Sequence, residues 1–545
     1  MTVDGSLHTP PSPPKPPRHA GATGRTLISV PGGSLTGPAM LAAAKLRVAQ
    51  WNQRAKDPRP AQEEALLRHC ARGADTEFGK AHGLKGVRSH RDFVERVPLR
   101  AYSDFEPMLE RMRRGARNVL HPEFIEHYGC SSGTSNTAAL NKFLPISREQ
   151  VKWQQKAGFD VLARYLTLAN DSDFTGGFTL QLLPPAVIRQ EGPVGITSNP
   201  GLMQRHMPAV SRMMTLPRPP LRDIENYDRK LDAIADEFLE HDVRALSGTT
   251  CWFPILFDRV LTAARRRGMR AETVTDLWPN LRALFGGGVY AEPYRGVIEA
   301  RAGRPVPLID NYNATEGGIF AVTDSFERTG MLMIPDRGVF FEFVPRSEHG
   351  RENARRVPLW EVERGEEYAV VVTTCSGLYA YQMGDYVRFT DVSPHRVEFC
   401  GRASGMLSVT QELTTAIEIE RAVAEALTAT RSTAVEFACG ADVGVDGTAK
   451  GRYVLFVEWE SAPADPRRFI ERFDEALQKI NRVYREHRAG EVAILAPEFV
   501  RLPTGSARRF MARIGREGAQ QKFPRILDDG KRDVMRAIAA TATLD

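Results

Sequence analysis

Small hydroxyl residues flank a glycine in a stretch of the chain that could bind phosphate. Its residues are Ser131, Ser132, Gly133, Thr134, Ser135 and Asn136, and Lys142 follows shortly after. Backbone N–H groups of such a loop can approach phosphate oxygens closely, while the hydroxyls add further donors. The spacing GxxxxGK[ST] of a Walker A loop is absent. Taken alone, the stretch is also compatible with an ordinary turn.

The same stretch fits a second chemistry. Residues 129–133 read Gly-Cys-Ser-Ser-Gly, which matches G-x-S-x-G, the nucleophile elbow of α/β-hydrolases. Ser131 would then be the nucleophile and would need a downstream acid and histidine. His395 and His487 are available, but neither lies in a distinctive sequence context.

A carboxylate lies between a threonine and two glycines in a second segment, residues 311–318 (Asn-Tyr-Asn-Ala-Thr-Glu-Gly-Gly). The segment follows a short apolar run at 306–309, which predicts a strand. Glu316 is well placed there to hold a hard cation such as Mg²⁺, because carboxylate oxygens suit that ion. The alternative is a glutamate exposed in a turn.

The third segment, residues 381–385, reads Tyr-Gln-Met-Gly-Asp and leads into a predicted strand at 386–389. An aspartate after a glycine can accept two hydrogen bonds from a ribose diol, as carboxylates do in dinucleotide sites. On its own, Asp385 is equally an aspartate in a turn.

Helical and strand patterns alternate around these segments, which indicates an α/β body. Helical spacing begins near Met40, and further helices are predicted at 102–114 and 225–240. Strand-length runs occupy 339–344, 368–374 and 453–459. A helix with one apolar face, carrying Phe469, Phe473, Leu477, Ile480 and Tyr484, follows the last of these strands.

Three regions follow from this pattern. Residues 1–37 are rich in proline and then in glycine and serine, which predicts a disordered tail. Residues 38–400 form a large α/β domain. A flexible Gly-Arg-Ala-Ser-Gly stretch at 401–405 then marks a hinge, and 401–545 form a smaller α+β domain.

Composition narrows the class of protein further. The 545 residues are 42% hydrophobic and 26% charged, as in an ordinary globular protein. The net charge of +6 (73 basic minus 67 acidic residues) is mild, and no groove-reading motif accompanies it, so we expect no nucleic-acid partner. Six scattered cysteines without a CxxC pair argue against a disulfide framework and a cysteine zinc site. No apolar run is long enough to span a membrane, and the N-terminus is unlike a signal peptide, so we expect the cytoplasm.

The order of the segments is more specific than any one of them. A Ser/Thr/Gly loop, a Tyr-x-x-Thr-Glu segment, a Gly-Asp segment and a Gly-Arg hinge resemble the layout of the adenylate-forming superfamily. The finer resemblance is to the Gretchen Hagen 3 family of acyl acid–amido synthetases, whose third nucleotide motif is usually YRVGD. It covers roughly residues 50–530 and includes the closing Gln-x-Lys-x-Pro-Arg pattern at 520–525, which contains Lys522.

The resemblance implies an enzyme that activates a carboxylic acid with ATP and Mg²⁺, releases pyrophosphate and passes the acyl group to an amine, such as that of an amino acid. Each candidate residue then has an expected role. Ser131, Ser132, Gly133, Thr134, Ser135 and Asn136 would cradle the β- and γ-phosphates; Thr315 would touch the α-phosphate; Glu316 would hold Mg²⁺; Tyr312 would pack on adenine; Asp385 would bind the ribose hydroxyls; Gly287 would allow close approach of the backbone; and Lys522 would enter the site from the smaller domain.

One departure from the family pattern concerns charge. Relatives usually carry a lysine shortly after the hinge, and Leu413 stands in its place here. The loss of a cation near a polyphosphate costs transition-state stabilisation unless a residue such as Arg402 or Lys142 compensates. The alternatives are therefore an acyl-CoA ligase of the same superfamily, a catalytically weakened nucleotide-binding homologue, and a hydrolase using Ser131.

Overall fold

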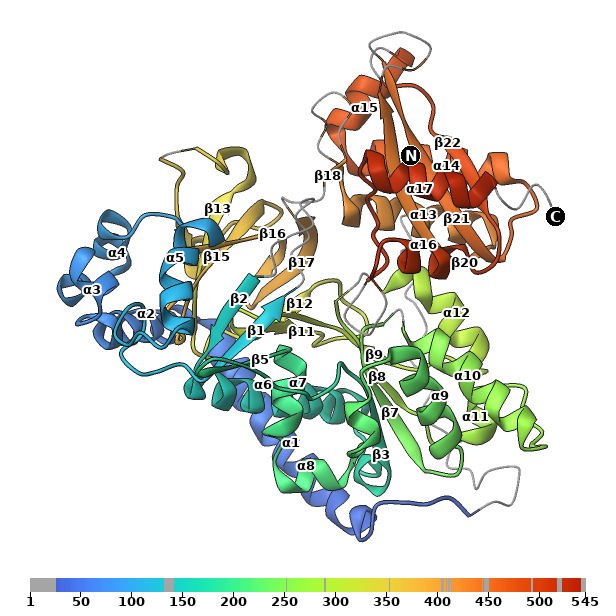
Figure 1. Ribbon diagram of the computed structural model, residues 1–545, viewed down its shortest axis with the longest axis horizontal. Helices are drawn as coiled ribbons and strands as arrows, with labels where there is room; N and C mark the ends of the chain where they lie inside the picture. Colours follow the sequence, from blue (N-terminus) through green and yellow to red (C-terminus); the bar gives the residue numbers. More distant parts are fainter. Residues whose placement is uncertain are drawn as a thin grey trace, which may run out of the picture.

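The computed structural model describes residues 26–131, 142–250, 252–288, 291–351, 353–402, 406–407, 409, 412, 414–443, 445, 450–491, 494–516 and 522–540. Its N-terminal part contains three sheets with their helices, and a C-terminal unit lies to one side, joined after β17 (Figure 1). The α/β class expected from the sequence is confirmed.

The largest sheet is antiparallel and carries the second and third segments. Its strand order is β10-β11-β12-β17-β16-β15-β13-β14. The strands are β10 (Asn311–Ala314), β11 (Gly318–Val322), β12 (Met331–Met333), β13 (Val339–Pro345), β14 (Val357–Pro358), β15 (Glu367–Thr374), β16 (Tyr381–Val392) and β17 (His395–Arg402). The runs predicted at 339–344 and 368–374 are thus strands, and their Val- and Phe-rich residues are buried.

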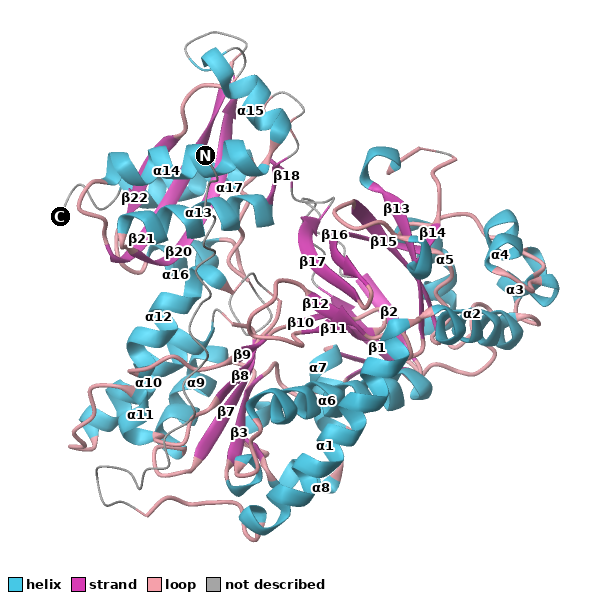
Figure 2. Cartoon of the chain, turned by 180° about the vertical axis from the view of Figure 1, so that it is seen from behind, coloured by secondary structure: helices cyan, strands magenta, loops and turns pink. Residues whose placement is uncertain are grey.

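A parallel sheet of order β6-β3-β7-β8-β9 occupies the other half of this region (Figure 2). Its strands are β3 (Phe178–Leu182), β6 (Thr215–Leu216), β7 (Val243–Gly248), β8 (Ala283–Phe285) and β9 (Leu308–Ile309). The helices connected with it are α9 (Tyr227–Glu237), α10 (Trp252–Arg266), α11 (Val274–Leu277) and α12 (Glu292–Ala302). The predicted helix at 225–240 is α9, and its apolar residues Leu231, Ile234 and Ala235 join the core under this sheet.

A third sheet, of order β2-β1-β5-β4, carries the start of the first segment. Its strands are β1 (His127–Ser131), β2 (Lys142–Ile146), β4 (Arg189–Glu191) and β5 (Val194–Thr197). β1 and β2 are antiparallel, with Ser131 opposite Lys142. Residues 132–141 lie outside the described residues, so the phosphate loop proper, from Ser132 to Asn136, is not placed.

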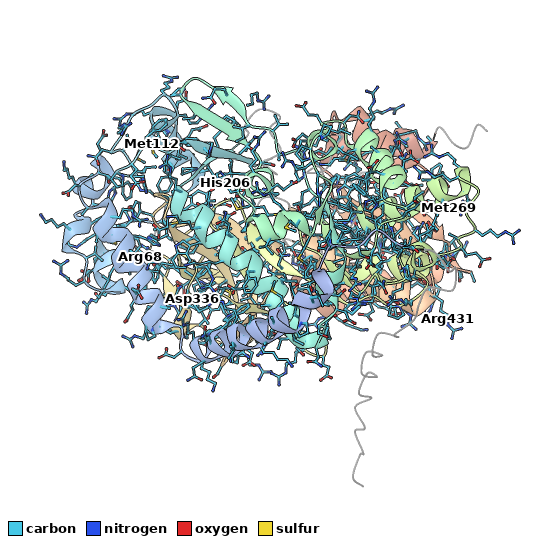
Figure 3. All side chains as sticks on the ribbon, turned by 90° about the horizontal axis from the view of Figure 1, so that it is seen from below. Arg68, Met112, His206, Met269, Asp336 and Arg431 are labelled. Atoms are coloured by element: carbon cyan, nitrogen blue, oxygen red, sulfur yellow. The ribbon has the colours of Figure 1, made fainter. Side chains whose placement is uncertain are left out.

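Helices surround these sheets: α1 (Gly33–Lys56), α2 (Arg59–Gly73), α3 (Glu77–Ala81), α4 (His90–Arg96), α5 (Tyr102–Arg113), α6 (Arg148–Ala169), α7 (Asn199–Arg205) and α8 (Ala209–Met213). The boundary that we expected for the tail is wrong: α1 begins at Gly33, not near Met40, and Ile28 N–H donates to the Glu240 carbonyl at 2.9 Å. Gly33 and Gly37 allow this contact, because a Cβ on either would collide with the backbone of 172–176. Long charged side chains project around the periphery (Figure 3).

The C-terminal unit is a sheet of order β20-β21-β22 with helices on both faces. It contains β20 (Thr433–Val443), β21 (Gly451–Ser461), β22 (Glu498–Leu502), α13 (Ala416–Thr430), α14 (Pro466–Ile480), α15 (Arg482–Arg488), α16 (Ser506–Arg513) and α17 (Asp529–Ala540). A short pair, β18 (Met406–Leu407) and β19 (Thr414–Thr415), precedes it. Alternate β21 residues explain the two faces: Leu455 packs with α13 and α14, while Phe456 packs with α16 and α17.

The predicted apolar helix of this unit is two helices. Phe469, Phe473 and Leu477 lie fully buried on α14 as expected, but the helix ends at Ile480. Asn481 then caps α15, accepting a hydrogen bond from the Tyr484 N–H at 2.9 Å. The chain therefore turns at Asn481, and Tyr484 reaches the same core from the second helix.

Candidate active site

Two large cavities meet in the middle of the molecule. One, of about 1530 Å³, lies between the N-terminal part and the C-terminal unit, and the other, of about 1660 Å³, lies within the N-terminal part. Gly288, Asn311, Asn313 and Lys522 line both. The second cavity also touches the carboxyl ends of β3, β7 and β8, which is where open parallel sheets bind ligands.

The second segment forms a hairpin that reaches both cavities. Tyr312 lies on β10 and lines the first cavity, while Thr315 and Glu316, in the turn before β11, line the second. Glu316 is only 9% exposed, so the alternative of an exposed turn glutamate is wrong. Gln150 of α6 fixes the turn, because its side-chain amide donates to the Thr315 carbonyl at 2.9 Å.

The third segment differs from its prediction. It does not precede a strand but lies inside β16, where Ala369 and Val371 pair with Tyr386 and Gln382. The extra residues form a bulge, with Gly384 at φ +80°. The bulge turns Asp385 into the first cavity, where its carboxylate accepts a 2.8 Å hydrogen bond from the Tyr312 hydroxyl. Asp385 is 1% exposed.

The first segment approaches the second through Gly129. A Cβ on Gly129 would lie 2.4 Å from Cγ2 of Thr315, so β1 can pass this closely only as glycine. The β1 strand thus brings Ser131 toward Thr315. For Ser131 and Arg402 the structure describes the backbone alone, and Arg402 pairs with Asp385 in the β16–β17 register.

The hydrolase alternative loses its geometry. A nucleophile elbow joins a strand to a helix, whereas the next described element after β1 is β2, which pairs back onto it. His395 is buried on β17, and burial lowers its pKa to about 4. Neither His395 nor His487 lines either of the two cavities.

The glycines at 286–288 make a tight backbone path at the end of β8. A Cβ on Gly286 would lie 2.5 Å from Oγ1 of Thr250, and Gly288 has φ +78°. Gly287 lines the second cavity, and its N–H donates to Thr250 Oγ1 at 3.4 Å. The expectation that backbone borders the site here is met.

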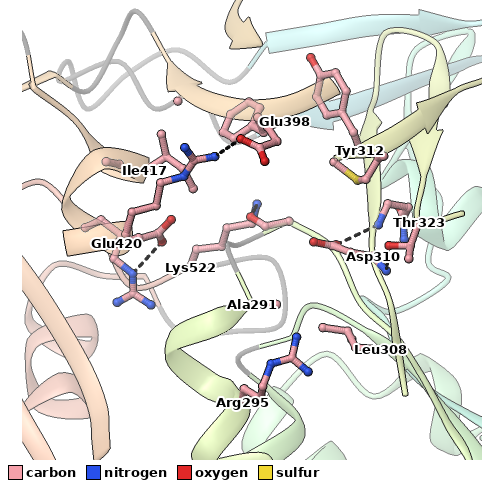
Figure 4. Close-up of a pocket in the computed structure, with 18 of the residues that line it drawn as sticks. Ala291, Arg295, Leu308, Asp310, Tyr312, Thr323, Glu398, Ile417, Glu420 and Lys522 are labelled. Atoms are coloured by element: carbon pink, nitrogen blue, oxygen red, sulfur yellow. Dashed lines mark hydrogen bonds and ion pairs between the residues drawn. The ribbon is translucent and has the colours of Figure 1, made fainter. Parts of the chain in front are cut away.

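Lys522 crosses from the C-terminal unit to this glycine path. Its ammonium donates to the Gly288 carbonyl. Figure 4 shows Lys522 pointing between Tyr312 and Asp310 on one side and Glu420 and Ile417 on the other. The sequence expectation that Lys522 enters the site from the smaller unit agrees with this position. Leu413 lies outside the described residues.

Apolar side chains cover much of the second cavity. Of the aromatic residues at 150–330, Phe159 and Phe174 line it, whereas Phe178 and Phe253 belong to the core under the parallel sheet. Sequence reasoning did not single out the methionines that also line it: Met40, Met203, Met207, Met214 and Met383. Scattered methionines give no sequence signal. Asn311 and Asn313 lay inside the second segment and could have been found there.

Cations near this cavity are largely neutralised. Asp160 accepts from Arg47 at 2.6 Å and from Arg337 at 2.8 Å, and Arg54 pairs with Asp336 at 2.8 Å. Burial raises the pKa of Asp160 to about 6 despite these partners. The wall between α1 and α6 is therefore bound to itself, which leaves the cavity suited to an uncharged body.

The fold is that of adenylate-forming ligases. The chain superposes on "AtGH3.15 acyl acid amido synthetase in complex with 2,4-DB" with a TM-score of 0.72 at 18% identity, covering 93% of this chain and 96% of that one. A 2-hydroxyisobutyryl-CoA ligase in the postadenylation state gives a TM-score of 0.55 at 16% identity, over 89% and 91% of the two chains.

Sequence comparison specifies the family. The GH3 family N-terminal, central and C-terminal domain models match residues 47–185, 332–402 and 417–531. An indole-3-acetic acid-amido synthetase, GH3.4 of Arabidopsis thaliana, is 24% identical over 81% of this chain and 84% of its own length. The jasmonoyl–L-amino acid synthetase JAR6 of Nicotiana attenuata is 24% identical over 77% and 82%. The chain belongs to the GH3 family of acyl acid–amido synthetases.

Proposed function

We propose that this protein uses ATP to activate a carboxylic acid as its acyl-adenylate and then transfers the acyl group to the amine of an amino acid. The observation that carries the proposal is the convergence at Lys522: the Tyr312–Asp385 pair lies in one adjoining cavity, and the Thr315–Glu316 turn lies in the other. Three sequence segments far apart in the chain thereby border a single volume.

The residues divide the substrates between the two cavities. Asp385 is placed to accept hydrogen bonds from the ribose hydroxyls of ATP, which puts the nucleoside in the cavity between the units. The acid would occupy the apolar second cavity, with its carboxylate near Thr315. Positioning of this kind supplies much of the acceleration of a two-substrate reaction.

In the first step, a carboxylate oxygen forms a bond to the α-phosphorus and the bond to the pyrophosphate oxygen breaks. Lys522 would offset the charge that develops on the α-phosphate and the leaving pyrophosphate. Glu316 fits Mg²⁺, because this ion is held in such sites by one or two carboxylates and the substrate phosphates. When bound, Mg²⁺ would neutralise phosphate charge. In the second step the amine nitrogen attacks the acyl carbon and AMP leaves.

The compartment and partners follow the same proposal. We assign the cytoplasm, because the five described cysteines are free thiols and four of them are buried. No described helix is long and apolar enough to cross a membrane. The partners are a small carboxylic acid and an amine, with no nucleic acid.

Acid-dependent ATP–pyrophosphate exchange tests the proposal, across aryl, indolyl and fatty acids without amine or CoA. Exchange with at least one acid is expected, and Lys522→Ala and Glu316→Ala should abolish most of it. Lys479→Ala is the matched control, since Lys479 lies on the surface of α14, paired with Glu425. ATP binding without exchange for any acid would instead favour the weakened homologue, in line with Leu413. Product formed with CoA but not with amino acids would favour the CoA ligase.

A further inference from the structure

A buried arginine three residues after Lys522 joins the C-terminal unit to α12. Arg525 is 7% exposed, and its guanidinium donates to Glu420 at 3.0 Å and to Glu436 at 2.6 Å. It also lies over the Phe437 ring at 4.1 Å. These partners all belong to the C-terminal unit. Arg525 makes its remaining printed hydrogen bond, however, to the hydroxyl of Tyr294 in the N-terminal part.

Tyr294 is built into this cluster on the other side. It is 4% exposed in the first turn of α12, and its hydroxyl donates to Glu436 at 3.2 Å while it accepts from Arg525. The hydroxyl thus bridges a buried cation and a buried carboxylate of the opposite unit. Bonds to charged groups are the stronger ones inside a protein.

The segment that carries Lys522 has little freedom beyond this cluster. Arg525 is tied to β20, because Cys439 N–H donates to the Arg525 carbonyl at 2.8 Å and Leu527 N–H donates to the Cys439 carbonyl at 2.9 Å. Pro524 stiffens the chain between Lys522 and Arg525. The position of Arg525 therefore governs how far Lys522 reaches.

The same short stretch of the N-terminal part receives both side chains. Lys522 donates to Gly288 and Arg525 to Tyr294, six residues further on. Two contacts, one polar and exposed to the cavity and one buried, thus hold the 522–525 segment beside 288–294. The second fixes the distance that the first must span.

We propose that Tyr294 is a positioning residue for adenylation: by holding Arg525 it places Lys522 in the site, and only in the arrangement in which the two units are docked. This inference rests on the proposed function, in which Lys522 acts in the first step. Tyr294 would touch neither substrate.

Tyr294→Phe is the sharpest test, because it removes the hydroxyl and keeps the ring. Loss of a hydrogen bond to charged groups should lower kcat of acid-dependent pyrophosphate exchange by about tenfold, with little change in KM for ATP. Tyr484→Phe is the matched control: Tyr484 donates to Asp474 at 2.8 Å, and Arg488 pairs with the same carboxylate, entirely within the C-terminal unit. It should leave the rate unchanged.

A double-mutant comparison separates positioning from general loosening. In a Lys522→Ala background, Tyr294→Phe should have no further effect on the residual exchange, since its influence passes through Lys522. The same fold loss in both backgrounds would overturn the proposal, and so would an unchanged kcat for Tyr294→Phe alone.

Hydrogen exchange of the full-length protein gives a readout that needs no catalysis. Tyr294→Phe should speed exchange in peptides covering 291–302 and 523–530 but not in those covering 466–488, and Tyr484→Phe should do the reverse. Unchanged exchange at 523–530 would overturn the inference even if wild-type protein activated no acid. Absence of wild-type exchange activity, by contrast, would count against the proposed function alone.

Discussion

At the scale of single residues, the site depends on carboxylates whose surroundings hold them in one orientation. Asp385 receives the Tyr312 hydroxyl on one oxygen and is almost fully buried. A side chain so fixed loses little entropy when it binds a ligand, which is why its removal should be felt in affinity.

Asp385→Asn should raise KM for ATP by about tenfold, because the neutral amide replaces a charged acceptor of the ribose hydroxyls. Asp391→Asn is the matched control, since Asp391 lies on the same strand, paired with Arg396, and lines neither of the two cavities. Steady-state kinetics with varied ATP measures both. Equal KM values for the two variants would rule out the ribose contact.

His69 gives a pH dependence of stability. It is 1% exposed on α2, and burial lowers its pKa to about 3, while its Nε2 lies 3.0 Å from the Gly338 carbonyl. The unfolded chain binds a proton near pH 6.5 and the folded chain does not, so stability falls as pH falls from 6.5 toward 3.

His69→Gln removes this proton and can still donate to Gly338. Between about pH 5.5 and pH 4.5, the free energy of unfolding of the wild type should fall by about 1.4 kcal/mol more than that of the variant. Urea unfolding at several pH values measures the difference, from which the other titrating groups cancel. Parallel pH curves would show that His69 is protonated in the folded protein.

At the scale of elements, the site is made by close approach of strands that are distant in sequence. β1 passes the β10–β11 turn at Gly129, and the β16 bulge brings Asp385 to Tyr312. Each contact depends on a small residue or a register shift.

Gly129→Ala should lower kcat/KM by about ten- to a hundredfold, because the new Cβ would displace Thr315 by pressing on its Cγ2. Thr315→Ser removes that methyl and keeps the hydroxyl, so the double variant should recover most of the loss. Gly530→Ala is the control, since its Cβ would meet nothing nearer than 3.7 Å. Pyrophosphate exchange measures all four proteins, and a double variant as impaired as Gly129→Ala would show that the methyl contact is not the cause.

These element-scale contacts explain what the sequence could and could not predict. Runs of β-branched and aromatic residues predicted β13, β15 and β21, since buried strands need them. The three segments marked the site because their residue types suit phosphate and ribose. The bulge in β16 and the break at Asn481 were missed, because both depend on partners elsewhere: a register with β15 and a cap for α15. The role of Arg525 was likewise not visible, since Tyr294 is 231 residues away.

At the scale of the whole molecule, the two units are joined by few side-chain contacts. Besides Tyr294 and Lys522, Arg301 of α12 pairs with Glu460 at 2.8 Å, and Arg421 of α13 pairs with Glu398 of β17 at 2.6 Å. Figure 1 shows the C-terminal unit beside α12 and β17, where these pairs lie. Two half-reactions in one site require such an interface to be reversible, and exposed or half-exposed ion pairs are weak enough to permit this.

Charge reversal at the Arg421–Glu398 pair tests whether docking of the units limits adenylation. Arg421→Glu places like charges in contact across the interface and should slow pyrophosphate exchange by about threefold to tenfold. Glu398→Arg combined with it restores the attraction. Recovery should be partial, because Arg388 stands opposite position 398 in the β16–β17 register and would face a second arginine there.

The expected result is a double variant faster than Arg421→Glu alone. Additive losses would mean that the pair does not couple the units, and the balance between adenylation and amide transfer would then depend on the buried Tyr294–Arg525 contact. Amide formation from a preformed acyl-adenylate separates the two steps: it should be unaffected by Arg421→Glu, because transfer follows release of the contact that adenylation needs. A molecule whose first step requires docking and whose second does not can use one cavity for both reactions.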